Sequence, residues 1–395
     1  MTSSSGIPTG ARVRSIDVVR GLAMVLMAID HVRVYSGLPP GGPEPALFFT
    51  RWVTHFCAPA FVFLAGASAF LVGRRRPGEL SRFLLARGVW LVVLELTVIR
   101  LAWTFNGDFA HYLMAGVIWV IGCSMIVMAG LVRLPLAAVG AIGVALVAGH
   151  DLVDPHLGEL VPRLAESAWS PLWKLLYLGF HAGPIRLGDG GPALMVLYTI
   201  VPWLGVMAAG YAFGAVLVME PARRDRLCLA IGLGAIALFV ALRVLDVYGD
   251  PRPWRASALP PALAFLDATK YPASLLFLLK TLGPAIAALP LAERVRGAVG
   301  GWLAVFGRVP LFFYLLHIPL IHALAILVAW LRMGEVSPWL LANHPMGNPP
   351  PPDGYAWPLW LVFATWAAAI ALLYIPCLWF ADLKRRRGDW WLRYL

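Results

Sequence analysis

The sequence predicts an all-α membrane protein, a bundle of about ten transmembrane helices that forms a single domain over residues 1–395. Composition favours this class, because 60% of the residues are apolar and only 13% are charged. In soluble domains, roughly 45–50% of the residues are apolar and roughly 25% are charged. Long apolar runs also recur along the whole chain, and each resembles the roughly 20 residues that cross a bilayer. A soluble globule is excluded, and so is disorder, because aromatic and aliphatic side chains are abundant.

The predicted spans follow one another along the chain and are separated by charged, Pro-rich or Gly-rich segments. Each is a run of mostly apolar residues, of which the fifth is the shortest. They cover residues 17–36, 52–73, 83–103, 112–132, 134–150, 194–218, 227–246, 270–291, 309–330 and 357–381. Residues 1–16 and the basic segment 382–395 are predicted as cytoplasmic tails.

The basic residues predict the orientation of this threading. Of the 32 Lys and Arg residues, 18 fall on one side of the predicted membrane and 8 on the other. Since cytoplasmic loops retain Lys and Arg, both termini are predicted to face the cytoplasm, in a multi-pass protein of the inner (plasma) membrane. The formal charge of +11 is spread over these loops rather than gathered on one face. A nucleic-acid partner is therefore not expected, whereas the lipid bilayer is.

The first span carries charged residues that a membrane would normally exclude. A charge at mid-bilayer costs about 2.5–3.5 kcal/mol on insertion scales, so each such residue needs a partner, water or a function. Asp17 and Arg20 lie near the predicted cytoplasmic end, and Asp30 and His31 near the other. Arg20 and His31 are eleven residues apart, which is about three helical turns and about 16 Å, so they share one face. His31 is a candidate proton acceptor, because imidazole titrates near neutral pH.

Other polar residues are predicted at comparable depths. His55 enters the second span from the outer side, and Tyr314 and His317 are one turn apart in the ninth. Lys270 and Tyr271 enter the eighth span from outside, next to Asp267, where this group is expected either to bind an acceptor or to anchor the helix at the interface. The histidine spacing does not support a metal site.

Two ion pairs are also predicted within the spans. Glu95 in the third span and Lys280 in the eighth are opposite charges at similar depth, so they are expected to pair. Arg243 and Asp246 are one turn apart in the seventh span and are expected to form a local pair.

The first span, with Asp17-Val18-Val19-Arg20-Gly21 followed by His31, is similar to the opening helix of integral membrane acyltransferases. The segments FFTRWVTHFCAPAFVFLAG, IVPWLGVMAAGYAFG, KYPASLLFLLKTLGP and FGRVPLFFYLLHIPL resemble the bacterial branch of the heparan-α-glucosaminide N-acetyltransferase catalytic-domain family. This resemblance implies transfer of an acyl group, with acetyl expected, from cytoplasmic acyl-CoA (acetyl-CoA) to an extracytoplasmic acceptor such as a sugar. No metal is expected.

The resemblance and the buried polar residues together suggest site residues. The general base is either His31, by the acyltransferase pattern, or His55, by its position. The predicted catalytic set is His31, His55 and Asp30. The predicted coenzyme-binding set is Arg20, Asp17, Arg82, Arg87, Tyr314 and His317.

A secondary transporter is the alternative, because buried charges also form substrate or proton paths. Ten spans divide into five plus five, as an inverted repeat would require. The sixth span, however, carries none of the charges of the first, which disfavours a repeat. The oligomeric state is open, and a homo-oligomer is one possibility.

Overall fold

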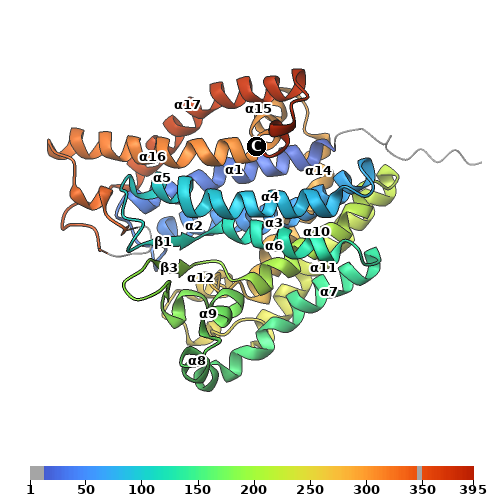
Figure 1. Ribbon diagram of the computed structural model, residues 1–395, viewed down its shortest axis with the longest axis horizontal. Helices are drawn as coiled ribbons and strands as arrows, with labels where there is room; N and C mark the ends of the chain where they lie inside the picture. Colours follow the sequence, from blue (N-terminus) through green and yellow to red (C-terminus); the bar gives the residue numbers. More distant parts are fainter. Residues whose placement is uncertain (1–12, 345–348) are drawn as a thin grey trace, which may run out of the picture.

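Long apolar helices make up most of the computed structural model, which describes residues 13–344 and 349–395 (Figure 1). Most of the predicted N-terminal tail, residues 1–12, lies outside the described residues. Six helices form the centre of the bundle. They are α1 (Arg14–Tyr35), α3 (Cys57–Arg75), α6 (Val117–Leu131), α10 (Ile200–Leu217), α13 (Leu275–Ala287) and α16 (Pro310–Met333).

Six further helices surround this centre. They are α4 (Leu80–Leu94), α5 (Arg100–Thr104), α7 (Leu136–Gly149), α11 (Pro221–Leu245), α15 (Gly297–Arg308) and α17 (Leu359–Arg386). Large apolar side chains on α11 and α17 are exposed, among them Leu233, Val244, Leu372 and Ile375. Exposed apolar surface of this kind is expected where helices face lipid. The short helices are α2 (Pro45–Trp52), α8 (Leu157–Ala165), α9 (Ser170–Trp173), α12 (Pro261–Leu266) and α14 (Leu289–Arg294).

Among the described residues, seven helical stretches are long and apolar enough to cross a membrane. They are Pro45–Arg75, Leu136–Leu164, Ile200–Leu217, Pro221–Leu245, Leu275–Arg294, Pro310–Met333 and Leu359–Arg386. The other predicted spans are also helical, but α1 and α4–α5 carry more charge and α6 is shorter. A multi-pass helical membrane protein is therefore confirmed, whereas the number of ten crossings stays a prediction.

A small three-stranded sheet departs from the all-α prediction. β1 (Leu113–Ala115) pairs in parallel with β3 (Ala193–Val196), and β2 (Ile185–Arg186) pairs antiparallel with β3. The predicted fourth and sixth spans are therefore wrong at their first residues, where the chain is extended. The helices α6 and α10 begin only after these strands. A short apolar run looks alike in a strand and in a helix, so hydropathy does not separate the two.

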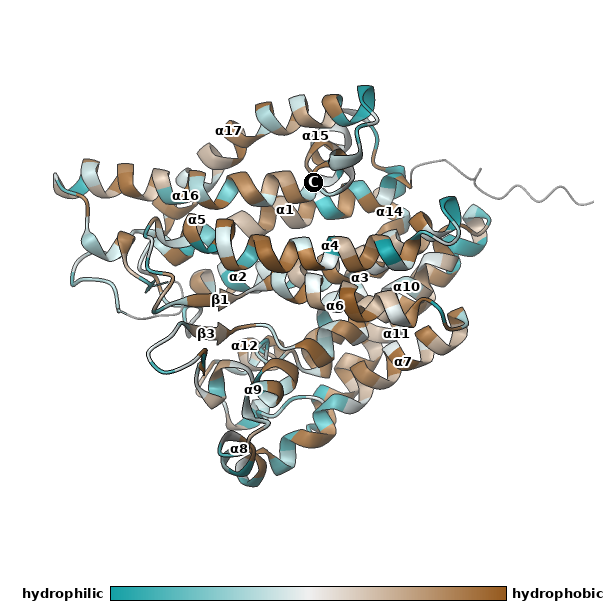
Figure 2. Cartoon of the chain, viewed as in Figure 1, coloured by the Kyte–Doolittle hydropathy of each residue, from teal (hydrophilic) through white to brown (hydrophobic). Residues whose placement is uncertain are grey.

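The polar turns gather at one end of the bundle. In Figure 2 the turns that join α3 to α4 and α10 to α11 are hydrophilic, and both lie toward the end where α1 begins. Both turns belong to the side that the basic residues predict to be cytoplasmic. The sidedness itself stays a prediction.

The predicted pair between Arg243 and Asp246 is wrong. The Arg243 guanidinium donates to the backbone carbonyl oxygens of Ala264 (2.9 Å) and Phe265 (3.1 Å). Asp246 instead lies 3.5 Å from Arg255. Asp246 ends α11 in a left-handed conformation, so its side chain leaves the helical face on which the prediction placed it.

Glycines allow the central helices to approach closely. A Cβ at Gly66 of α3 would overlap the carbonyl oxygen of Met207 in α10, and a Cβ at Gly210 would overlap that of Phe63. The same relation joins α1 to α15 through Gly21 and Gly307. Small residues at helix crossings are the usual means by which membrane helices pack.

We expect Gly66→Val to destabilise the bundle, because α3 and α10 must separate to admit the side chain. Overpacking of this kind costs about 1–3 kcal/mol. Gly234→Val in α11 is the matched control, since a Cβ there meets no atom within 4 Å. Thermal unfolding in detergent, followed by tryptophan fluorescence, measures the difference. Equal midpoints for the two variants would contradict this packing.

Candidate active site

Three neighbouring cavities run through the bundle. The inner cavity, of about 270 Å³, is lined by Arg20 and Arg87. The central cavity, of about 570 Å³, contains His31. The outer cavity, of about 480 Å³, contains His55. Phe61, Val117 and Tyr314 line both the inner and the central cavity. Pro40, Arg51, Phe180, Lys270 and Tyr271 line both the central and the outer cavity.

The inner cavity combines two arginines with apolar walls. Arg20 donates from Nη2 to Ser68 Oγ at 2.8 Å, and Arg87 lines the same space from α4. Most other lining side chains are aliphatic or aromatic. Guanidinium groups bind phosphate well, and apolar walls suit a thin, mostly uncharged chain. The residues present therefore fit a phosphate-bearing coenzyme with a pantetheine arm.

Three residues of the predicted coenzyme-binding set, Asp17, Arg82 and His317, lie outside this cavity. His317 contacts His31 instead. Asp17 is 5% exposed and sits where α1 crosses α15, beside Gly307. Arg82 is exposed on α4. Neither residue lines the inner cavity. Tyr314, in contrast, lies in the wall between the inner and central cavities.

Two histidines meet at the wall of the central cavity, where His31 lines the cavity and His317 is fully buried. His31 Nδ1 is 2.6 Å from His317 Nε2, and their rings stack with centroids 4.8 Å apart. Trp103 holds the His31 ring edge-on at 4.9 Å. Because α1 packs against α16, residues far apart in sequence meet here. The sequence grouped His31 and His317 in one site but did not predict their direct contact.

The surrounding acceptors fix the tautomer of this pair. His317 Nδ1 lies 2.7 Å from the carbonyl oxygen of Tyr314 and 3.1 Å from that of Phe313. Carbonyl oxygens only accept, so His317 Nδ1 carries a hydrogen and, in neutral His317, Nε2 is an acceptor. His31 Nδ1–H must then donate to His317. The lone pair of His31 Nε2 is then free, because no described residue donates a hydrogen bond to this nitrogen.

Asp30 lies beside His31 in sequence but binds elsewhere. Its carboxylate accepts from Arg33 Nε at 2.8 Å and lies 3.3 Å from Arg51 Nη1. Two guanidinium groups thus share one carboxylate in the wall of the central cavity. His31 is oriented by His317 rather than by Asp30.

Glu95 also lines the central cavity, and its predicted pair with Lys280 is wrong. Glu95 Oε2 accepts from the backbone N–H of Trp119 at 2.9 Å, so the carboxylate caps the first turn of α6. Lys280 Nζ donates to the carbonyl oxygen of Leu266 at 2.7 Å. The two side chains are both buried but face different neighbours. Glu95 Oε1 is buried and has no hydrogen-bond partner in the described part of the chain. Glu95 begins a π-helical turn, Glu95–Ile99, and such turns are frequent at functional sites.

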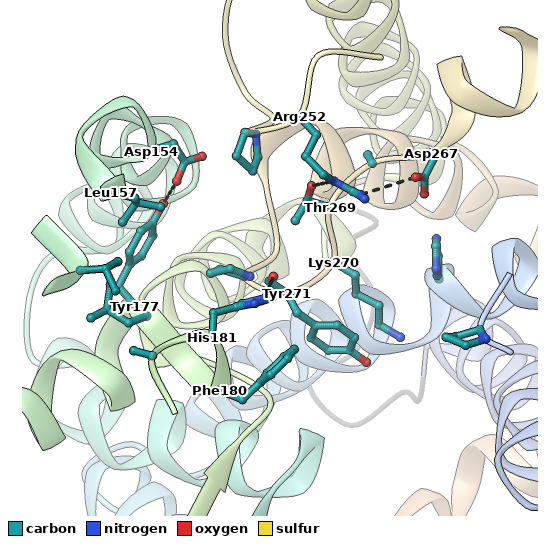
Figure 3. A pocket seen from close by; sticks show the side chains of 18 of the residues that line it. Asp154, Leu157, Tyr177, Phe180, His181, Arg252, Asp267, Thr269, Lys270 and Tyr271 are labelled. Carbon is teal, nitrogen blue, oxygen red and sulfur yellow. Dashed lines mark hydrogen bonds and ion pairs between the residues drawn. The ribbon is translucent and has the colours of Figure 1, made fainter. Parts of the chain in front are cut away.

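The outer cavity holds His55 and several basic groups (Figure 3). His55 is 6% exposed, and neither of its ring nitrogens has a hydrogen-bond partner among the residues that the structure describes. Its ring lies edge-on to Phe277 at 5.4 Å. Figure 3 shows Arg252 turned toward Asp267 and Thr269, whereas Lys270 extends away from both. His55 and His31 thus lie in different, adjoining cavities.

His344 completes a wall of the central cavity. Burial against the Trp339 ring, 4.1 Å away, lowers the pKa of His344 to about 4. This imidazole is therefore neutral at pH 7 and adds no charge to the cavity. In the sequence, Glu95 and His344 are recognisable only as polar residues among apolar ones. No pattern there predicts that Glu95 caps α6 or that His344 lines the central cavity.

Comparison with known proteins identifies a family for this chain. The family model described as heparan-α-glucosaminide N-acetyltransferase, catalytic, matches residues 12–244, more than half of the chain. The matched region includes Arg20, His31 and Arg87, and it ends before Lys270 and His317. A search of curated proteins gives no match. Within the described ranges, no group of three or more His, Cys, Asp or Glu side chains is placed to hold a metal ion. The chain belongs to the heparan-α-glucosaminide N-acetyltransferase catalytic family.

Proposed function

We propose that this protein is a transmembrane acyltransferase that moves an acetyl group from cytoplasmic acetyl-CoA to an extracytoplasmic hydroxyl or amine, with a sugar as the expected acceptor. One observation carries the proposal: His31, whose Nε2 keeps a free lone pair, lines the central cavity. This cavity adjoins the arginine-lined inner cavity on one side and the outer cavity on the other. The family match favours this enzyme over a secondary transporter.

The donor would enter through the inner cavity. Arg20 and Arg87 would bind the phosphates by charge-assisted hydrogen bonds, with exposed Arg82 and the buried Asp17 near the same end of the bundle. The apolar walls would surround the pantetheine arm. Tyr314 stands where the inner cavity meets the central one, so it is placed to contact the thioester end. When bound, acetyl-CoA supplies the activated acyl carbon.

His31 would act as the general base. Its Nε2 accepts the proton of the acceptor N–H or O–H while that nitrogen or oxygen forms a bond to the thioester carbonyl carbon. The C–S bond then breaks, and the thiolate takes up the proton that His31 held. Throughout, His31 Nδ1–H continues to donate to His317 Nε2, so the imidazolium stays hydrogen-bonded in the cavity. His317 is thus a positioning residue, and Asp30 holds Arg51 in the cavity wall.

Geometry favours His31 over His55 as the base. A general base needs a defined tautomer with a free lone pair facing the reacting group. His317 gives His31 that tautomer, whereas His55 has no partner to fix its own. His55 is better placed to contact the acceptor in the outer cavity.

Replacing His31 should abolish acetyl transfer, whereas replacing His55 should not. We expect His31→Ala to lower kcat by about 10²–10⁴-fold, the usual share of general-base action. His55→Ala should retain kcat within about tenfold of wild type, since it keeps the base. Purified protein, [¹⁴C]acetyl-CoA and glucosamine provide the assay. The opposite ranking of the two variants would assign the base to His55.

Variants of His317 test its positioning role. His317→Leu removes the acceptor for His31 Nδ1–H, so kcat should fall while KM for acetyl-CoA stays unchanged. In His317→Gln the side-chain oxygen is able to accept the same hydrogen bond, and we expect partial recovery of kcat. Initial rates over a range of acetyl-CoA concentrations separate the two constants. If Gln were no better than Leu, or if KM alone changed, His317 would not act through His31.

Binding of the donor should depend on the arginines of the inner cavity. Loss of one charged hydrogen bond costs about 1.5–3 kcal/mol, so Arg87→Gln or Arg20→Gln should weaken acetyl-CoA binding by roughly 10–150-fold. Arg226→Gln is the control, because Arg226 lies in α11, outside the three cavities. Isothermal titration in detergent measures the affinities. Unchanged binding in both cavity variants would place the donor elsewhere.

A further inference from the structure

We propose that Glu95 binds the donor's amide group that lies next to the thioester, and that this contact positions the acyl carbon beside His31. In acetyl-CoA two methylene groups separate this amide from the sulfur. Its N–H needs an acceptor once it leaves water, because an unsatisfied buried donor is costly. The role rests on the proposed function and adds a positioning residue to it, with Glu95 Oε1 as the acceptor.

The two carboxylate oxygens of Glu95 have different surroundings. Oε2 accepts from the backbone N–H of Trp119 at 2.9 Å, which fixes the side chain at the first turn of α6. Oε1 has no hydrogen-bond partner within residues 13–344 and 349–395, although Glu95 is only 1% exposed. The positive end of the α6 dipole favours the ionised carboxylate. A buried carboxylate oxygen without a donor is costly, so a ligand N–H at this point would be bound strongly.

Glu95 lies where the inner cavity meets the central one. It lines the central cavity together with His31 and Gly116, and the residue after Gly116, Val117, lines both cavities. A Cβ at Gly116 would lie 2.7 Å from Glu95 Oε1, so this oxygen lies against the backbone of the boundary. A donor that enters past Tyr314 would bring its last amide to Glu95 as its thioester reaches His31.

The other carboxylate along this path already has donors. Among the described residues that line the inner and central cavities, the acidic ones are Asp30 and Glu95. Asp30 accepts from Arg33 at 2.8 Å and lies 3.3 Å from Arg51. Glu95 Oε1 is thus the carboxylate oxygen that remains for a ligand.

Replacing one N–H of the donor tests this contact directly. Two analogues of acetyl-CoA each have one amide –NH– replaced by an ester –O–, the first analogue at the amide next to the thioester and the second at the amide farther along the arm. Isothermal titration in detergent measures their binding. Wild type should bind the first analogue about tenfold or more weakly than acetyl-CoA, the loss of one hydrogen bond to a charged group. The second analogue controls for the change from amide to ester and should lose less.

Glu95→Gln separates the ligand contact from the helix cap. The single side-chain oxygen of Gln is able to accept from Trp119 N–H, which leaves an NH₂ donor where the ligand N–H needs an acceptor. We expect this variant to bind acetyl-CoA about tenfold or more weakly than wild type and to bind the first analogue equally well. Glu293→Gln is the matched control, because Glu293 also accepts from a backbone N–H, that of Ser15 at 2.8 Å, and lies outside the three cavities.

Gly116→Ala tests the same contact with the charge retained. The added methyl group would lie 2.7 Å from Glu95 Oε1, so the carboxylate must shift. The preference for acetyl-CoA over the first analogue should therefore fall in this variant as well. Thermal midpoints of all variants, measured in detergent, show that each is folded.

Equal binding of acetyl-CoA and the first analogue by wild type would overturn the role of Glu95. So would a preference for acetyl-CoA that survives in Glu95→Gln. Either result leaves the proposed function in place if acetyl-CoA binding still depends on Arg20 and Arg87. A wild-type protein that binds no acetyl-CoA would instead reject the proposed function, and the role of Glu95 with it.

Discussion

The proposed chemistry depends on the hydrogen bond between His31 and His317. It requires α1 and α16 to meet at a fixed depth and rotation. Gly21 and Gly307 hold the start of α1 against α15, and Tyr35 near its end donates to the carbonyl oxygen of Trp103 at 2.8 Å. With both ends of α1 fixed, the two imidazoles stay in contact. The backbone carbonyls of α16 then determine which nitrogen of His31 is free.

Charge is distributed along the three cavities in a way that suits transfer across an insulating layer. The inner cavity is lined by Arg20 and Arg87, which the proposed function assigns to the phosphates of the coenzyme. Between the inner and outer cavities, the central cavity is lined by His31, which contacts the fully buried His317. Because electrostatic interactions are strong where water is scarce, these arginines would hold the coenzyme while its acyl end meets the acceptor beside His31.

Helical periodicity predicted some of this arrangement, and tertiary packing decided the rest. Arg20 and His31 were expected on one face of a helix, and both line the chain of cavities, because a period of 3.6 residues fixes that relation. Glu95 and Lys280 were expected to pair because a sequence reveals depth in the membrane but not the direction that each helix face takes. The contact of His31 with His317 depends on which helices are neighbours, which no local pattern determines.

A cryo-electron microscopy structure with a non-hydrolysable thioether analogue of acetyl-CoA tests the central claim most directly. The analogue's phosphates should lie at Arg20 and Arg87, its arm should pass Tyr314, and its acyl end should lie beside His31 Nε2. An analogue whose phosphates lie at Lys270, or whose acyl end lies outside the central cavity, would contradict the proposed transfer.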